Sequence, residues 1–389
     1  MASITPLDPA PAALAGGRDR LAQIGLARQV ILYGDRQLAG AAPVLESWIE
    51  RSWQRCLASG QKPEQELSFE MLAPQTPRRT EEAHHGLVQA ARPVLEKLVQ
   101  AIANTRYFAI LTNAHGVVVD VNGQIDRRDR RADLIARIGV DLSEQSVGTS
   151  AIGAALAELQ PVWLHRGEHF FNANTAYSCA GAPLFGPDGR CAGMLDLTGV
   201  DAVERPELRH LVVQSARSIE NALLLNQPHQ LLIRLNWSSH SQGQDTDGLV
   251  CLDADGWVTG ANPAARQMVA ALNSTGSTNS KGPAAVHCSE VLALPFEMLF
   301  DAGRRVALGY QQTIEVPLWS GLRLHALPLL KGSAQRMGGA PPAPPLPLKD
   351  VETALIRKAV TEARGNVMQA ARVLGISRAT VYRRLGRNK

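Results

Sequence analysis

Residues Leu348–Lys389 read LKDVETALIRKAVTEARGNVMQAARVLGISRATVYRRLGRNK and contain three short helical patterns end to end. Gly365 ends the first helix, and Asn366 caps the second. Gly375 opens a tight turn, after which Ser377 caps a third helix that is rich in Arg and hydroxyl residues. This order predicts a helix-turn-helix, whose second helix enters the DNA major groove.

The positive charge of the chain is concentrated in this segment. It holds ten Lys/Arg and three Asp/Glu, a net charge of +7, and because the whole chain carries +4 the remainder carries −3. Such a basic module suits the phosphate backbone of double-stranded DNA, although a solvated helical tail with incidental charge is the alternative. We expect Arg378 and Thr380 to reach base edges, and Arg384 and Arg387 to hold phosphates. The full set of DNA-contacting candidates is Asn366, Ser377, Arg378, Thr380, Tyr382, Arg383, Arg384 and Arg387.

Length and composition describe a globular protein of two to four domains. The chain has 389 residues, of which 45% are hydrophobic and 20% charged. No uninterrupted apolar run approaches 18 residues and the N-terminus lacks a signal-peptide pattern, so we expect a cytoplasmic protein without a membrane partner. The five cysteines are widely spread and form no CxxC or His/Cys cluster, which predicts neither a metal site nor a cofactor.

The N-terminal region, 1–79, is expected to be helical. Residues 1–17 are rich in Ala, Pro and Gly and read as loose, two helices are expected over 18–60, and 61–79 form a connection. The second helix carries Trp48 and Trp53 on one apolar face, a pattern typical of core packing.

Residues 80–226 predict helices around an antiparallel sheet, an α+β sensor-type domain. A long helix over 81–105 is expected to kink or break at Pro93. The strand patterns that follow lie at 107–112, 116–121, 161–165, 180–185 and 190–198, and the helical patterns at 143–158 and 206–225.

A smaller α+β unit is expected over 227–330. It contains a strand–turn–strand pattern at 248–260, a helix opening at Asn262, and strand patterns at 312–318 and 322–329. Residues 331–347, KGSAQRMGGAPPAPPLP, read as a Gly/Pro-rich linker. The helix-turn-helix segment 348–389 follows directly.

Several stretches resemble one family, the acetoin-catabolism regulators, which are sigma-54-dependent activators. SWIERSWQRC is similar to a helix near their N-terminus, and GVDLSEQSVGTSAIGAALAELQPVWLHRGEHF with YSCAGAPLFGPDGRCAGMLDLTG resembles their GAF domain. DGLVCLDADGWVTGANPAA is similar to their PAS-like module, and GN…AARVLGISRATVYRRL resembles a Fis-type helix-turn-helix. The resemblance implies a multidomain α+β protein with N-terminal helices, a GAF domain, a PAS-like α+β domain and a C-terminal three-helix Fis-type module.

One domain of that family has no counterpart in the patterns of this sequence. In that family an ATPase domain stands between the PAS-like module and the helix-turn-helix, and it needs a GxxxxGK[ST] loop to cradle phosphates. This chain contains no such pattern. We therefore expect effector sensing and DNA binding without ATP-driven opening of sigma-54 promoters.

The resemblance also implies a ligand site in the GAF stretch. Glu168, His169 and Cys179 fall on matched positions near the expected pocket, and Asp196 ends a central strand. Polar residues on such a wall would orient a small ligand in an apolar cavity. The alternative is that Cys179 is a small buried hydrophobe and His169 a structural residue.

Together these patterns predict a homodimeric transcriptional regulator that binds double-stranded DNA and an unidentified small-molecule effector, with RNA polymerase or a full-length paralogue as further partners. Two other classes stay open. One is an interaction protein that antagonises such a paralogue, acting through its helices. The other is a GAF-type thiol enzyme in which Cys179 and Cys191 serve as attacking and resolving thiols.

Overall fold

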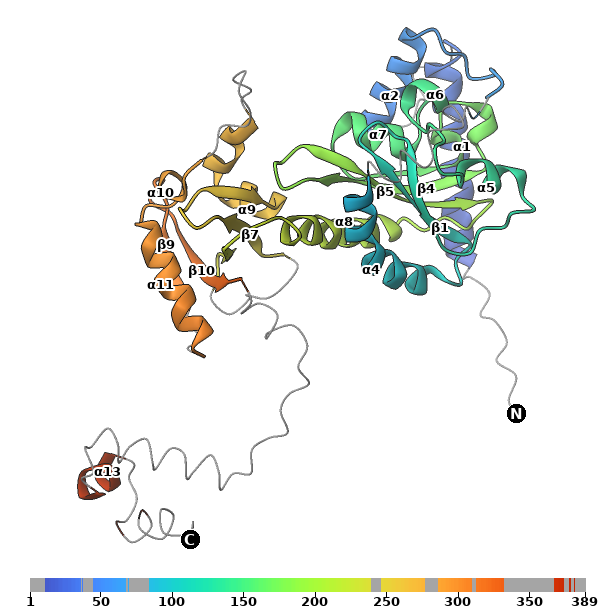
Figure 1. The fold of residues 1–389 in the computed structure, drawn as a ribbon. Helices are drawn as coiled ribbons and strands as arrows, with labels where there is room; N and C mark the ends of the chain where they lie inside the picture. The colour runs from blue at the N-terminus through green and yellow to red at the C-terminus, as the bar shows by residue number, and fades with distance from the viewer. Residues whose placement is uncertain are drawn as a thin grey trace, which may run out of the picture. The chain divides into compact units, whose positions relative to one another are not determined.

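The computed structural model describes residues 11–35, 37, 45–67, 69, 84–238, 246–276, 286–309, 313–331, 367–373, 378 and 381. The chain divides into two compact units, Met1–Lys331 and Gly332–Lys389. The first unit contains two five-stranded antiparallel sheets with helices packed against them (Figure 1). The predicted mixed α+β class is therefore confirmed. No helix in the described part is long and apolar enough to cross a membrane.

The first sheet has the strand order β2-β1-β5-β4-β3. Its strands are β1 (Tyr107–Asn113), β2 (Val118–Asn122), β3 (Val162–His165), β4 (Tyr177–Phe185) and β5 (Cys191–Val200). Every residue of β1 is buried, because helices cover both faces of the sheet at this strand. This explains why YFAILTN reads as a nearly continuous apolar run instead of alternating.

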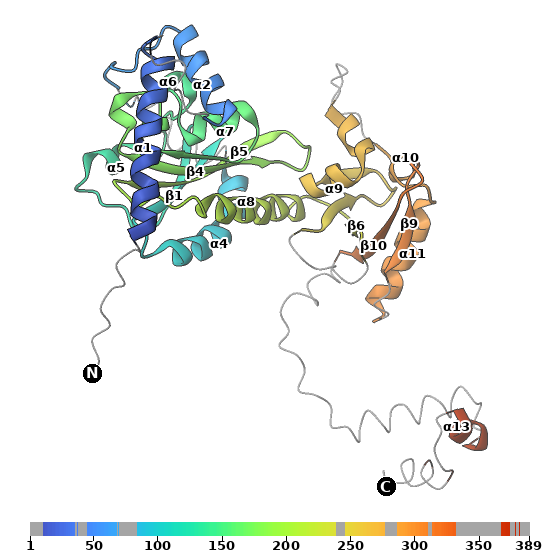
Figure 2. The same cartoon turned by 180° about the vertical axis from the view of Figure 1, so that it is seen from behind.

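Different helices cover the two faces of the first sheet (Figures 1 and 2). One face packs against α4 (His85–Ile102) and α8 (Leu208–Leu225). The other face carries α5 (Arg130–Ile135), α6 (Glu144–Val147) and α7 (Ala151–Glu158). Outside these lie α1 (Pro11–Ile31) and α2 (Ser47–Ala58), whose buried Trp48 and Trp53 join the same core, as their spacing predicted.

Three helix predictions need correction. Helix α1 already begins at Pro11, a favourable first helical position, whereas residues up to 17 were expected to be loose. Helix α4 continues through Pro93, because Ala90, Ala91 and Leu95 around it are buried against the sheet and the proline ring faces solvent. The helix expected over 143–158 is divided at Gly148, which has φ +65°. A Cβ there would meet the Phe171 ring at 2.7 Å, so a helical continuation with another residue does not fit.

The second sheet has the order β8-β7-β6-β10-β9. Its strands are β6 (Leu231–Asn236), β7 (Gly248–Leu252), β8 (Val258–Ala261), β9 (Ile314–Pro317) and β10 (Arg323–Leu330). Its helical elements are α9 (Pro263–Met268), η4 (Ala270–Gly276), α10 (Cys288–Val291) and α11 (Phe296–Ala307). The helix expected from Asn262 to 272 thus becomes α9 followed by the 3₁₀ turn η4. The sequence reading missed β6, the central strand, and α11.

Several contacts join the two sheets within this unit. Leu224, at the end of α8, is fully buried in a cluster with Leu232 and Leu249 of the second sheet. The turn between β4 and β5 meets the start of α9: the Pro187 carbonyl accepts hydrogen bonds from Ala261 N at 3.0 Å and from Arg266 Nη2 at 2.8 Å.

The second unit contains α13 (Val367–Val373). Ala371 and Val381 are buried, whereas Arg378 is exposed. The other DNA-contacting candidates, Asn366, Ser377, Thr380, Tyr382, Arg383, Arg384 and Arg387, lie outside the described residues.

Candidate functional site

A narrow cavity of about 40 Å³ lies over the first sheet, on the face covered by α5, α6 and α7. Its apolar lining is Phe69, Ile110, Ile135, Leu142, Val147, Ala151 and Ile152. Its polar lining is Ser150, His169, Asn174, Tyr177, Cys179, Asp196 and Thr198. We call it the acceptor cavity. Its volume is roughly three times the minimum that admits one water molecule, so it suits a ligand of a few heavy atoms.

His169 presents an unprotonated nitrogen to this cavity. Its Nδ1 lies 2.9 Å from the carbonyl oxygen of Arg166, which can only accept, so Nδ1 carries the proton. Burial lowers the pKa of His169 to about 4, so the ring is neutral at pH 7. Nε2 is buried without a hydrogen-bond partner among the described residues. The ring therefore offers a lone pair.

Asn174 presents a second acceptor. It lies in a short 3₁₀ turn, η3 (Asn172–Asn174), and is 3% exposed. Its Nδ2 donates to the carbonyl of Val147 at 3.1 Å, which fixes the orientation of the amide. Its Oδ1 is buried and unpartnered within the described ranges.

Asp196 supplies the third group, from the middle of the sheet on β5. One carboxyl oxygen accepts a hydrogen bond from Thr198 Oγ1, which also lies 3.3 Å from Cys179 Sγ. The other oxygen, Oδ1, is buried with no partner in the described part of the chain. Burial raises the pKa of Asp196 to about 7, so near neutral pH the carboxyl exchanges between protonated and ionised forms.

These three groups define what the cavity can bind. Leaving a buried acceptor unpaired costs about 1–3 kcal/mol, so His169 Nε2 and Asn174 Oδ1, joined by Asp196 when it is ionised, favour a ligand that brings hydrogen-bond donors. The surrounding side chains are apolar. A small molecule with one or more hydroxyl groups and an alkyl body matches this chemistry.

The N-terminal helices hold the loop that carries His169. Arg28 of α1 is buried and donates to the carbonyls of Gly167 at 2.8 Å and His169 at 2.5 Å, and to that of Phe170 at 2.9 Å. Trp53 of α2 donates through Nε1 to the carbonyl of Glu168 at 2.9 Å. The loop conformation therefore depends on helices distant in sequence.

Glu168 has a different place from the other three predicted ligand residues. It is buried, but its carboxylate accepts from the His165 backbone N–H at 2.6 Å and pairs with Arg20 of α1 at 2.8 Å. It does not line the acceptor cavity. His169, Cys179 and Asp196 are brought together there, whereas Glu168 anchors the loop on the opposite side.

The two thiols of the enzyme alternative are far apart. In the β4–β5 ladder Cys179 lies opposite Thr198, and Cys191 lies opposite Phe185. Six residues of strand separate the two positions, about 20 Å at 3.3 Å per residue, whereas a disulfide needs Cα atoms within about 7 Å. Burial also raises the pKa of both thiols. This geometry does not support a paired-thiol mechanism. Among the described residues no group of three His, Cys, Asp or Glu side chains is placed to hold a metal ion.

Comparison with known proteins assigns both ends of the chain. Residues 33–221 match the MimR N-terminal domain, and residues 347–387 match the Fis family of bacterial regulatory proteins. The acetoin catabolism regulatory protein of Cupriavidus necator is 30% identical over 262 residues, covering 65% of this chain and 37% of that protein. This chain is thus similar to the acetoin catabolism regulators.

One further relative and one solved structure are also similar to this chain. The acetoin dehydrogenase operon transcriptional activator AcoR of Bacillus subtilis is 31% identical over 46% of this chain and 30% of its own length. The chain thus spans about a third of the length of these curated relatives. The solved complex of the E. coli DhaR N-terminal region with DhaL covers 73% of this chain and 99% of its own, with a TM-score of 0.44 and 15% identity.

Sequence reasoning missed Asn174 and Arg28 at this site. Asn174 sits in FFNANTAYS, a stretch without helical or strand periodicity, so nothing local indicated that its amide would turn inward. Arg28 looked like one more solvated charge on a helix. Its isolation between Ile24 and Ile31, on the apolar side of α1, was the available signal.

Proposed function

We propose that this chain is a DNA-binding transcriptional regulator whose acceptor cavity binds a small hydroxyl-bearing effector. The cavity carries this proposal, because three of its buried polar atoms have no partner in the described part of the chain, and the chain also matches the Fis family over residues 347–387. The first sheet with its helices would be the GAF sensor and the second sheet the PAS-like module. Relatives named as transcriptional regulators and activators support the class.

The effector class follows from the cavity. Neutral His169 and Asn174 Oδ1 can only accept, so a ligand must donate to be held by both. The relatives are named for acetoin, a four-carbon hydroxyketone with one hydroxyl donor. Butane-2,3-diol has two donors and can satisfy both acceptors, and acetoin can satisfy one, so both are suitable probes. Butanone is the matched control because it keeps the carbon chain but has no donor.

A thermal-shift titration tests the effector class. A ligand at a hundredfold excess over its Kd stabilises the folded state by about 2.7 kcal/mol. We expect stabilisation by acetoin or the diol, none by butanone, and loss of the effect in His169→Leu. Arg92→Gln, an exposed arginine on α4 outside the cavity, serves as the matched control and should keep it. Equal responses to butanone and the diol would rule out donor recognition.

Operator binding completes the test. We expect the probe that stabilises the protein to change its affinity for operator fragments recovered by genome-wide mapping of bound DNA. The regulator is expected to be a dimer, because a helix-turn-helix commonly reads two half-sites related by two-fold symmetry. Light scattering that gives a monomer both free and on DNA would contradict this.

We further propose that the regulator works without ATP. No phosphate-cradling GxxxxGK[ST] pattern occurs in the sequence. It would act at ordinary promoters by recruitment or occlusion, or compete with a full-length relative for shared operators. In vitro transcription with each polymerase holoenzyme separates these modes, and ATP-dependent opening of a sigma-54 promoter by this protein alone would disprove the proposal.

A further inference from the structure

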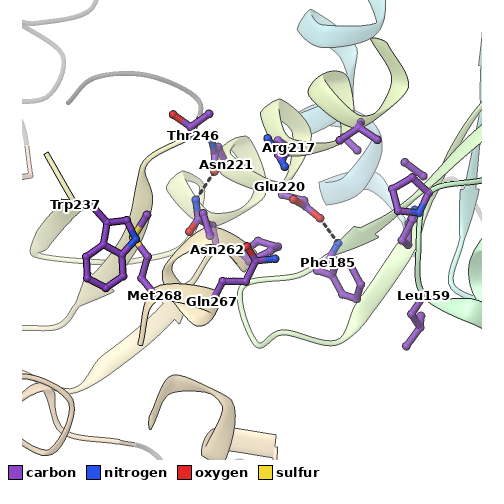
Figure 3. Close-up of a pocket in the computed structure, with 17 residues that line it drawn as sticks. Leu159, Phe185, Arg217, Glu220, Asn221, Trp237, Thr246, Asn262, Gln267 and Met268 are labelled. Carbon is purple, nitrogen blue, oxygen red and sulfur yellow. Dashed lines mark hydrogen bonds between the residues drawn. The ribbon is translucent and has the colours of Figure 1, made fainter. Parts of the chain in front are cut away.

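A second pocket, of about 480 Å³, lies beside α8 where the two sheets meet (Figure 3). Phe185 of β4 lies on the side of the first sheet, and Trp237, Gln267 and Met268 on the side of the second. Arg217 and Glu220 project into it from α8. We call it the junction pocket. Its volume falls within the usual range for small-molecule sites.

Arg217 is the available cation of this pocket. It is exposed, and among the described residues it forms neither a hydrogen bond nor an ion pair. Its neighbour Glu220 is 6% exposed. One of its carboxyl oxygens already accepts a hydrogen bond from the backbone nitrogen of Phe185 at 2.9 Å. Burial raises the pKa of Glu220 to about 7, so near neutral pH it cancels only part of the arginine's charge. The pocket therefore favours an anion.

The walls favour a flat apolar body. Phe185, Pro183 and Leu159 form one side, and Trp237 forms the other with half of its surface exposed. A ring packed on the face of Trp237 would cover apolar surface now open to solvent, and aromatic faces pack well in offset or edge-on contact. A carboxylate on that ring would meet Arg217 with two parallel hydrogen bonds, the arrangement its planar guanidinium prefers.

We propose that the junction pocket is a second small-molecule site, which binds an aromatic monocarboxylate through Arg217 and Trp237. It differs in charge preference from the acceptor cavity, whose three acceptors disfavour an anion. A ligand there would touch residues of both sheets at once. Binding there would therefore stabilise the contacts of both sheets with α8, whether or not the effector occupies the acceptor cavity.

Isothermal titration of the full chain with benzoate tests the proposal, with benzyl alcohol as the neutral probe of similar shape. We expect saturable binding of one benzoate, at least tenfold tighter than benzyl alcohol. Arg217→Gln should weaken benzoate at least tenfold and Trp237→Leu severalfold. Arg92→Gln, an exposed arginine on α4 outside the pocket, is the matched control and should bind as the wild type does.

His169→Leu separates this site from the acceptor cavity and should bind benzoate normally even where it loses the hydroxyl-bearing effector. Absence of saturable benzoate binding to the wild type, or unchanged binding to Arg217→Gln, would overturn the second site. Loss of benzoate binding in His169→Leu would overturn it as well, because the anion would then occupy the acceptor cavity.

Discussion

The acceptor cavity holds about 40 Å³ among buried side chains, whereas the junction pocket holds about 480 Å³ beside exposed ones. The first is built inside one core, and three of its polar atoms have no hydrogen-bond partner among the described residues. The second lies between two cores, and its cation faces solvent. Selectivity in the cavity comes from desolvated acceptors, because a ligand that leaves them unpaired loses binding free energy. Selectivity in the pocket comes from charge and contact area. The two regions should therefore respond very differently to substitution.

The largest contrast concerns stability. Ile110, on the cavity wall, is fully buried in the core between β1 and the helices. Ile110→Ala should lower the free energy of unfolding by about 2–5 kcal/mol, as lost transfer energy and a new void add together. Urea denaturation measures it. A loss below 1 kcal/mol would mean that the cavity wall collapses readily and does not hold a fixed shape.

The next test asks whether ligand binding in either region is independent of DNA recognition by the C-terminal segment. Arg378→Ala should cost about 1–3 kcal/mol in operator binding, because a bidentate contact to a base is lost, and should change binding to random DNA little. Fluorescence anisotropy on both DNAs gives the ratio. Stabilisation by the effector and binding of benzoate should stay as in the wild type. An equal loss on random DNA would assign Arg378 to phosphate contact instead.

Acidity sharpens the comparison, because each region has one buried carboxyl. The pKa values of Asp196 and Glu220 are both raised to about 7, so the folded state retains protons that the unfolded state releases. Their contribution to stability is complete below about pH 4 and is lost as pH rises to about 7. Each group contributes a slope of at most about 1.4 kcal/mol per pH unit.

Asp196→Asn and Glu220→Gln should each flatten the fall in unfolding free energy between pH 4 and 7, measured by urea titration at several pH values. Above pH 8 the difference in slope from the wild type should vanish. If only one substitution flattens the dependence of unfolding free energy on pH, only the carboxyl in that region has a raised pKa in the folded state.

The smallest effect belongs to the junction pocket. Trp237 is half exposed at the end of β6, so Trp237→Ala should change the free energy of unfolding by no more than about 0.5 kcal/mol. The same urea experiment as for Ile110→Ala provides the comparison. A loss near 2 kcal/mol would show that this tryptophan belongs to the core and does not form one wall of an open site.

Much of this architecture was predictable from local patterns. The five strands of the first sheet follow apolar runs, and the turn at Pro187 follows from its Gly-Pro-Asp-Gly sequence. The break at Gly148 was not predictable, because SVGTSAIG by itself is compatible with a helix. The break depends on Phe170 and Phe171, whose side chains occupy the space beside Gly148 in the folded protein. Strand β6 was missed because LLIRLN is a short apolar run without alternation, which periodicity alone does not distinguish from a buried helical segment, although it pairs with two neighbours.

The candidate site divides in the same way. His169, Cys179 and Asp196 could be proposed from the resemblance, since they lie in its most specific stretches. Asn174 could not, because its amide acts through the backbone carbonyl of Val147. Arg28 offered only its place on the apolar side of α1, because its partners are carbonyls of the 167–170 loop. Every residue has a backbone carbonyl, so the sequence does not show which carbonyl will accept a hydrogen bond from a given side chain.

Helix α8 has a practical consequence for dissecting this protein. Its first turns pack on the first sheet, but Leu224 at its end is fully buried against the second. A fragment that stops at residue 226, where a boundary between sensor modules was predicted, would expose Leu224 to water. The complementary fragment from 227 would have an empty place in its core. Each piece would therefore be less stable alone than together, and the two sheets should melt in a single cooperative transition.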